Sequence, residues 1–134
     1  MTTQGFTNRM KLAEIEGDPR CFQLLEDVFY TSKSGRVCAA RAMQLDGMPW
    51  CGYNGASIPR LFWRLIGSPF TGLYRKAALF HDYFYQFHVD GCGGAITRIE
   101  ADRMFLEMMK FLGVARWRRN LIYFGVRVGG WASW

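Results

Sequence analysis

The 134-residue sequence contains no long hydrophobic run, and this absence excludes one class of protein. No stretch approaches the roughly 18 consecutive apolar residues that a membrane-spanning helix needs. The first ten residues, MTTQGFTNRM, also lack the apolar segment of a secretory signal peptide. We therefore expect a protein that is made in the cytoplasm and keeps its thiols reduced.

Cysteine and histidine are scarce, which limits the metal and redox chemistry available to the chain. No two of the four cysteines have the Cys-x-x-Cys spacing of a zinc site or a dithiol redox motif. The chain has two histidines, His81 and His88, and both lie in the segment KAALFHDYFYQFH of residues 76–88. Any reaction that needs an imidazole must therefore use this segment.

Repeats, low-complexity tracts and linkers are also absent from the sequence, so a second domain is not expected. Half of the residues are apolar, and a chain of this length can bury a core without disulfides. We predict one domain over residues 1–134, rich in strands over residues 1–50 and helical over residues 57–130. The predicted fold class is α+β.

The first half of the sequence predicts a small antiparallel sheet. Residues 11–15 alternate weakly and are predicted as a strand. Residues 21–31 and 36–44 are predicted as the arms of a β-hairpin, because Gly35 between them can supply the positive φ of a hairpin loop. The apolar side chains expected on one face of the first arm are Phe22, Leu24, Val28 and Tyr30.

The second half predicts a bundle of three to four helices. Ser57 is placed to cap a short helix over residues 58–66, and a long helix is expected over residues 73–88. Thr97 and Glu100 form a capping box for a helix that ends before Gly113. The last helix is expected over residues 115–128.

Two of these helices carry residues suited to acid–base chemistry. His81 and Tyr85 are four residues apart and share one side of the helix, whereas Asp82 lies about 100° round from His81. Asp102 lies beside the apolar stripe of the next helix, where a carboxylate is costly unless it is paired. The spacing predicts a hydrogen bond between His81 and Asp102, which would fix the tautomer of the imidazole.

Two interpretations of this pair are open. In the first, the His81–Asp102 pair deprotonates a water molecule, Asp82 binds a metal, and the second ring nitrogen of His81 faces an open cleft. In the second, the pair is a structural clasp that ties two helices together. On either interpretation His88, near the end of the helix, is expected to be a capping or surface residue.

Several motifs resemble a family of phage and prophage proteins catalogued as domain of unknown function 1353. They are NGASIPRLFW, YRKAALFHDYFY, ADRMFLEMM and YFGVRVGG, which occur in that order between residues 22 and 130. The family has aspartate where this chain has Asn54. The resemblance implies a bacteriophage or prophage source and hence synthesis in the host cytoplasm, with the virion as an alternative final location, but it implies no activity.

A more distant resemblance links the two helices to phospholipase A2, especially the enzyme of parvoviral capsids. The motif Ala-Ala-x-x-His-Asp-x-x-Tyr ends at Tyr85 and is followed by Ala-Asp-x-x-Phe around Asp102. This resemblance implies that His81 is the general base, that Asp102 orients it, with Tyr85 in support, and that Asp82 binds calcium.

The calcium loop of that family has the pattern Tyr-x-Gly-x-Gly, and its backbone carbonyls complete the metal shell. The matching segment here has Ser57 in place of the last glycine. Because calcium takes six to eight oxygen ligands, Asp82 alone is not sufficient. The resemblance assigns the metal to Asp82, Gly52, Tyr53 and Gly55, with Asn54 and Ser57 in support.

The charge of +6 suits an anionic partner. A lipid hydrolase that acts in phage entry or lysis would use this charge, with Trp117, Trp131 and Trp134, at a membrane surface. The alternative is a tail, neck or capsid accessory protein that binds other virion proteins. Nucleic-acid binding through Arg116, Arg118 and Arg119 is the third hypothesis.

Overall fold

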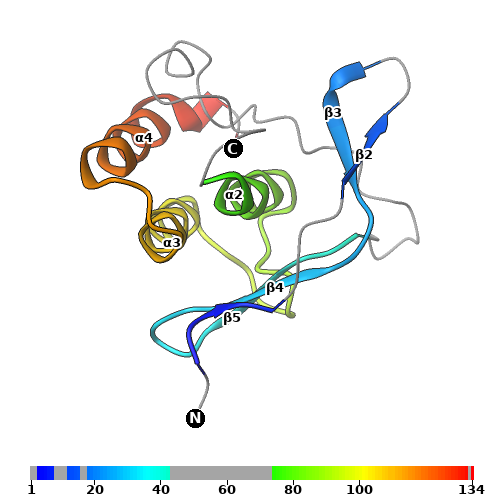
Figure 1. Cartoon of the computed structure of the whole chain (residues 1–134), viewed down its shortest axis with the longest axis horizontal. Coiled ribbons are helices and arrows are strands. Elements are labelled where there is room, and N and C mark those ends of the chain that lie inside the picture. The colour runs from blue at the N-terminus through cyan, green and yellow to red at the C-terminus, as the bar shows by residue number, and fades with distance from the viewer. Residues whose placement is uncertain (1–2, 8–11, 16–17, 43–73, 133) are drawn as a thin grey trace. The chain divides into compact units, whose positions relative to one another are not determined.

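The computed structural model describes residues 3–7, 12–15, 18–42, 74–132 and 134, with only the backbone for residues 12–15 and 18–23 (Figure 1). The chain divides into two compact units. The first comprises Met1–Asn54 with Val89–Ala95, and the second comprises Gly55–His88 with Ile96–Trp134. The described strands lie in the first unit and the described helices in the second, so the predicted α+β class is confirmed. That the whole chain is one domain stays a prediction.

The first unit contains a three-stranded antiparallel sheet of β1 (Gly5–Phe6), β4 (Val28–Thr31) and β5 (Val37–Ala40) in the order β1-β4-β5. Strands β4 and β5 form the predicted hairpin, with Val28 opposite Ala40. Its turn is closed by the Gly35 N–H, which donates to the Ser32 carbonyl at 3.0 Å. Gly35 has a φ of 92°, so its predicted role in the turn is confirmed.

The predicted strand over residues 11–15 is confirmed as β2 (Leu12–Ile15), which pairs antiparallel with β3 (Asp18–Leu24). The prediction of one continuous hairpin arm over residues 21–31 is wrong, because the chain leaves β3 after Leu24 and starts β4 at Val28. Asp27 holds this break. Its carboxylate accepts from the Ala42 N–H at 2.7 Å and from Arg41 Nη1 at 3.1 Å.

The expected apolar face of that arm is buried where the structure describes it. Leu24, Val28 and Tyr30 are enclosed even though they belong to two strands, and the side chain of Phe22 lies outside the described part. Burial therefore follows the predicted alternation on either side of the break, where Glu26 is exposed.

The segment Val89–Ala95 belongs to the first unit and is organised around Asp90. Asp90 Oδ1 accepts from the N–H groups of Cys92 and Gly94, and Arg36 Nη2 lies 3.2 Å from Asp90 Oδ2. Burial opposes ionisation of Asp90, but these hydrogen bonds and the guanidinium outweigh it and lower the pKa. The Asp90 carbonyl in turn accepts from the Ala39 N–H in β5 at 2.8 Å.

The second unit contains helices α2 (Arg75–Phe87), α3 (Arg98–Phe111) and α4 (Arg116–Gly129), followed by the 3₁₀ turn η1 (Gly130–Ala132). Helix α3 packs against both α2 and α4 (Figure 1). The predicted ends of these helices agree with the structure to within two residues, and the short helix over residues 58–66 lies outside the described residues. Across the described helices, none is long and apolar enough to cross a membrane.

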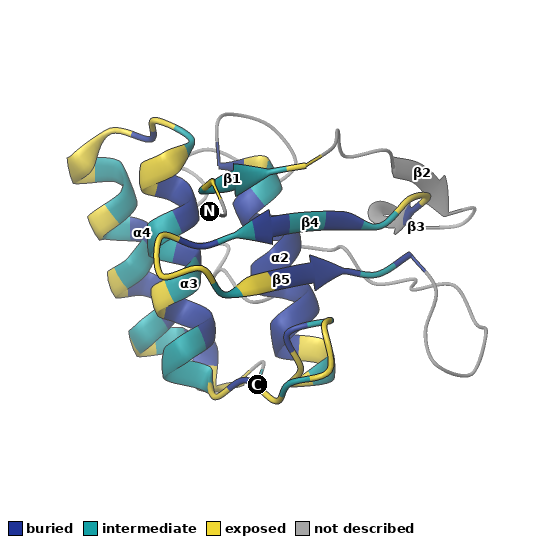
Figure 2. Ribbon diagram, turned by 90° about the horizontal axis from the view of Figure 1, so that it is seen from below, coloured by how far each residue is buried: buried dark blue, intermediate teal, exposed yellow. Residues whose placement is uncertain are grey.

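Local sequence explains where α2 and α3 begin and end. The Thr97–Glu100 capping box is present, with the Glu100 N–H donating to Thr97 Oγ1 at 3.3 Å. Helix α2 is followed by its C-cap residue His88, which has a φ of 55° and is exposed, so its predicted place at the helix end is confirmed. Figure 2 shows that α2 is buried along most of its length, and the buried run Ala77–Tyr85 includes His81 and Asp82.

Candidate active site

Helix α2 carries two buried polar side chains, His81 and Asp82, which are 0% and 2% exposed. Small residues at Ala77 and Ala78 are also enclosed, as expected where another element approaches the helix closely. The His81 ring stacks on Phe105 of α3, with 4.4 Å between centroids and an interplanar angle of 26°. The ring of Tyr85 contacts it as well, at 4.3 Å. Packing therefore fixes the plane of the imidazole.

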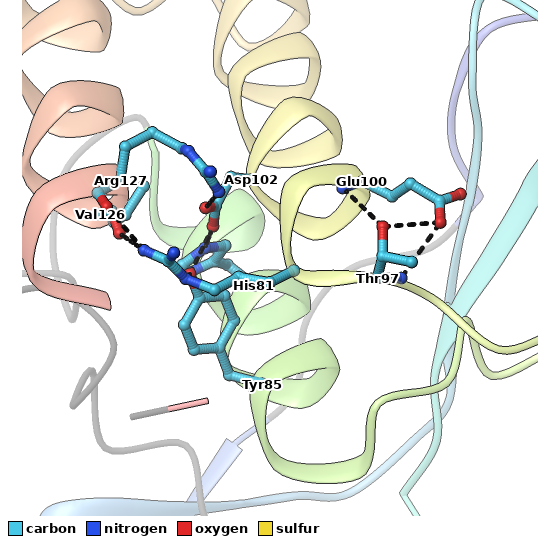
Figure 3. Close-up of polar contacts among 8 residues, drawn as sticks. His81, Tyr85, Thr97, Glu100, Asp102, Val126 and Arg127 are labelled. Atoms are coloured by element: carbon cyan, nitrogen blue, oxygen red, sulfur yellow. Dashed lines mark hydrogen bonds and ion pairs between the residues drawn. The ribbon is translucent and has the colours of Figure 1, made fainter. Parts of the chain in front are cut away.

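Asp102 of α3 is the centre of the site and is fully buried (Figure 3). Its Oδ1 lies 2.7 Å from His81 Nε2 and accepts from the Tyr85 hydroxyl at 2.6 Å. Its Oδ2 accepts from Arg127 Nη1 of α4 at 2.6 Å. The hydrogen bond predicted between His81 and Asp102 is thus confirmed. We call His81, Tyr85, Asp102 and Arg127 the Asp102 network.

The network sets the charge of each member. Burial lowers the pKa of His81, and the hydrogen bond to Asp102 does not offset this effect. Burial also opposes ionisation of Asp102, but the hydrogen bonds from His81, Tyr85 and Arg127 outweigh it, so the pKa of Asp102 lies below its usual value. At neutral pH the imidazole is therefore neutral, and the Arg127 guanidinium balances the Asp102 carboxylate.

These charges also fix the tautomer of His81. An ionised carboxylate only accepts hydrogen bonds, so the proton of a neutral imidazole that contacts it must be on Nε2. Nδ1 then carries the lone pair of the neutral ring. The tautomer is assigned from the hydrogen bond rather than from a hydrogen position.

Arg98, the first residue of α3, links the network to the end of α4. Its Nη2 donates to the carbonyls of Val126 and Arg127 at 2.9 and 2.7 Å, and its Nε donates to the Tyr85 hydroxyl at 3.3 Å. The last carbonyls of a helix carry a partial negative charge, so a guanidinium is stabilising there. Arg98 therefore holds α4 where Arg127 reaches Asp102.

The C-terminal residues pack closely against Tyr85. A Cβ atom on Gly130 would lie 2.7 Å from the Tyr85 hydroxyl oxygen, so only glycine fits there without a shift. The Trp134 ring meets Tyr85 edge-on at 5.0 Å and stacks on His88 at 3.9 Å, with an interplanar angle of 8°. Trp134, expected at a membrane surface, is instead partly covered and engaged within the unit.

The sequence-predicted site is brought together in part. His81, Asp102 and Tyr85 are in contact, whereas Gly52, Tyr53, Asn54, Gly55 and Ser57 lie outside the described residues. The expected open cleft beside His81 is not observed, because its side chain has no exposed surface. Sequence reasoning missed Arg98, Arg127 and Gly130. The unbalanced charge of a buried Asp102 signalled that a cation was needed, but not which one.

The described residues alone do not fit a calcium site. They contain no group of three or more His, Cys, Asp or Glu side chains that could hold a metal ion, and Asp82 supplies one carboxylate. Because calcium takes six to eight oxygens, the remaining ligands would have to come from residues 52–57. The calcium assignment stays a prediction.

Comparison with known proteins places the chain in a family. Residues 22–126 match the model of the family described as "Protein of unknown function (DUF1353)", and the chain belongs to this family. No solved structure matches the chain.

Two uncharacterized proteins of Sinorhizobium fredii are similar to the chain. The protein y4jT is 32% identical over 118 residues, which cover 87% of this chain and 31% of y4jT. The protein y4iH is 28% identical over 130 residues, which cover 93% of this chain and 47% of y4iH. The chain thus spans about a third of one relative and about half of the other.

Proposed function

We propose that this member of the DUF1353 family is a lipid or ester hydrolase in which His81 activates water. The observation that supports the proposal is the hydrogen bond from His81 Nε2 to Asp102 Oδ1, in a setting that keeps the imidazole neutral and the carboxylate ionised. A general base must be unprotonated at working pH and held by a partner that stabilises its protonated form. His81 meets both conditions.

In the proposed reaction, His81 Nδ1 takes a proton from water while the water oxygen attacks the ester carbonyl carbon. Asp102 stabilises the imidazolium that forms, as an ionised carboxylate does for a catalytic histidine. The tetrahedral intermediate then collapses, the bond to the alcohol oxygen breaks, and the imidazolium returns the proton to the leaving alcohol. Tyr85 and Arg127 position Asp102 and do not exchange protons with substrate.

Access is the main demand that the structure places on this mechanism. The ring of His81 is fully buried, so the groups that cover it must separate before water can reach Nδ1 with an ester carbonyl beside it. Enzymes commonly open and close such sites through movements of loops or neighbouring elements. We therefore expect activity to depend strongly on the physical form of the substrate, with aggregated lipid favoured over dissolved monomers.

The test is hydrolysis of phospholipid vesicles by the full chain, with and without calcium. We expect His81→Gln to lower the rate by at least about 100-fold, the usual scale for loss of a general base. His88→Gln is the matched control, because His88 is exposed at the end of the same helix and lies outside the Asp102 network. Circular dichroism of each variant separates loss of chemistry from loss of fold. Equal rates for wild type and a folded His81→Gln would refute the proposal.

Calcium dependence is a separate arm of this experiment. Asp82→Asn is expected to raise the calcium concentration needed for half-maximal rate, if Asp82 and the backbone carbonyls of residues 52–57 hold the ion. A rate that a calcium chelator leaves unchanged would remove calcium from the proposal and leave the role of His81 standing.

A second candidate is a non-enzymatic virion component in which the Asp102 network is a clasp. Its support is the complete burial of His81 and Asp102, which join α2, α3 and α4 through three hydrogen bonds. On this proposal the wild type hydrolyses no ester, His81→Gln lowers the melting temperature, and the protein co-sediments with phage particles.

A further inference from the structure

Helix α4 and η1 expose a line of large apolar side chains. Trp117, Phe124, Val128 and Trp131 are 60%, 60%, 58% and 70% exposed. We call these four residues the exposed ridge. Single exposed hydrophobic residues are ordinary on protein surfaces, but a contiguous apolar patch commonly marks an interaction site.

The ridge runs along one side of α4. Phe124 and Val128 follow Trp117 at intervals of seven and eleven residues, close to two and three helical turns. Ile122, Gly125 and Val126 are buried and lie around the other side of the same helix. Helix α4 thus has an apolar inner face and a second apolar face that is exposed. Figure 2 shows that α4 carries exposed residues. At 1.5 Å per residue the ridge is roughly 20 Å long.

The charge around the ridge is of one sign. Residues 108–134 contain no aspartate or glutamate, whereas they contain the basic residues Lys110, Arg116, Arg118, Arg119 and Arg127. Of these, Arg127 is paired with the buried Asp102. The first turn of α4 has no acidic residue, and its N-cap Ala115 makes no side-chain cap hydrogen bond. Because a helix N-terminus carries partial positive charge, arginines there are unfavourable unless an anion lies near.

We propose that the exposed ridge docks the protein on an anionic lipid bilayer. Tryptophan suits the bilayer surface, since its ring is apolar and its N–H can reach a polar group. An amphipathic helix of this kind lies in the interface with its apolar face among the acyl chains and its arginines near the phosphates. The inference deepens the proposed function, on which it rests for the view that the docked bilayer is also the substrate.

Two other occupants fit the ridge less well. A single-stranded nucleic acid stacks its bases on aromatic rings along a basic groove, but Val128 offers no ring and the ridge stands on a convex helix. A second copy would bring the two basic surfaces together without a carboxylate to pair them, which like-charge repulsion disfavours.

The test measures binding without requiring hydrolysis. The full chain is titrated with vesicles of phosphatidylcholine and phosphatidylglycerol, or of phosphatidylcholine alone, and bound protein is measured by co-sedimentation. We expect the double variant Trp117→Ser/Trp131→Ser to bind anionic vesicles at least about 10-fold more weakly, because two large apolar side chains no longer enter the interface. Leu25→Ser is the matched control, since Leu25 is 52% exposed in the first unit and lies off the ridge.

Arginine variants separate the electrostatic contribution to vesicle binding from the contribution of the apolar side chains. Arg116→Gln on α4 should weaken binding to anionic vesicles a few-fold, and Arg103→Gln, exposed on α3, should weaken it less. Raising the salt concentration should reduce the difference between the affinity for anionic vesicles and the affinity for neutral vesicles.

Several outcomes would overturn the inference. They are unchanged vesicle binding by the double variant, equal binding to neutral and anionic vesicles, loss of self-association instead of vesicle binding, or ridge-dependent binding of a single-stranded oligonucleotide with none to vesicles. If the wild type binds vesicles through the ridge but hydrolyses no lipid, the docking surface is supported and the proposed hydrolase function is refuted. If the protein still hydrolyses vesicle lipid after the ridge is removed, the hydrolase function is supported and the docking surface is refuted.

Discussion

Arg127 provides the most direct test of the Asp102 network, because its removal leaves a buried carboxylate without its cation. The perturbation is Arg127→Met, which keeps much of the aliphatic stem and removes the guanidinium. Arg127 Nη1 lies 2.6 Å from Asp102 Oδ2, and the Asp102 side chain is fully buried. His81 and Tyr85 still donate to the other oxygen, Oδ1, so the carboxylate would lose one of three donors.

The magnitude follows from these contacts. A hydrogen bond to a charged group contributes about 1.5–3 kcal/mol, and a buried charge without its partner costs more. The Arg127 side chain is 32% exposed, so water already screens part of the interaction. We expect a loss of about 2 kcal/mol in the free energy of unfolding at pH 7. For a chain of this length that corresponds to a fall of about 6–10 °C in melting temperature.

The pH dependence gives this prediction its specificity. The pKa of Asp102 is lowered in the folded protein, so its ionised form stabilises the fold above the unfolded-state pKa near 4, and this stabilisation is lost as the pH falls through the folded-state pKa. The difference between wild type and Arg127→Met should therefore be largest at neutral pH and shrink below about pH 4.

The assay is urea denaturation followed by tryptophan fluorescence at several pH values. Arg103→Met is the matched control, because Arg103 is exposed on α3, and it should change the unfolding free energy by less than about 0.5 kcal/mol. An equal loss in both variants, or an Arg127→Met loss that is the same at pH 3 and pH 7, would refute the role assigned to the ion pair.

Three further predictions concern single positions, each read by denaturant unfolding. Gly130→Ala should destabilise the protein by about 1–3 kcal/mol, and by less in a Tyr85→Phe background, because the added Cβ meets the Tyr85 hydroxyl at 2.7 Å; equal losses in both backgrounds would contradict the packing. Gly91→Ala should lower the free energy of unfolding more than Gly93→Ala, since both glycines have positive φ but only the Cβ at Gly91 would lie 1.9 Å from a backbone oxygen; a larger loss for Gly93→Ala would contradict this placement of Gly91. His81 has a lowered pKa in the folded protein, so the stabilisation from its neutral form is fully present above the unfolded-state pKa near 6.5 and is lost as the pH falls from there through the folded-state pKa; His81→Gln should flatten this fall in the free energy of unfolding, and an unchanged slope would refute the assignment.

The helices could be predicted from sequence because their signals are local. The Thr97–Glu100 box fixes the start of α3, and the glycines after Val89 exclude a continuation of α2. The prediction of a continuous hairpin arm over residues 21–31 was wrong because the break in it depends on a non-local contact. Leu24 and Val28 share one face of the predicted arm with only Glu26 between them on that face, and a single polar residue does not show that Asp27 turns its carboxylate to the Ala42 N–H and ends the pairing. Such a break depends on a partner 15 residues away, which periodicity does not encode.

The site residues also fall into those that local sequence predicts and those that depend on how the helices pack. His81 and Asp102 could be paired from sequence because helical spacing puts both on inner faces and a buried carboxylate requires a donor. Arg127 could not be chosen from the four arginines of α4, because the choice depends on how that helix is rotated against α3. That rotation is held by Arg98 and by the fit of Gly130 against Tyr85, and both contacts join segments about 30 to 45 residues apart.

The Asp102 network can serve as a clasp and as a base because both roles need the same charges. A clasp that joined a charged imidazole, a carboxylate and a guanidinium would enclose an unbalanced cation, which burial disfavours. The lowered pKa of His81 avoids this cost, because the neutral ring donates from Nε2 while the Arg127 guanidinium pairs with Asp102. The same neutral ring is what a general base requires. A catalytic role would therefore need no change in the charges that stabilise the helices before proton transfer. Only at that step does the imidazolium form, and it forms beside a carboxylate that is already ionised.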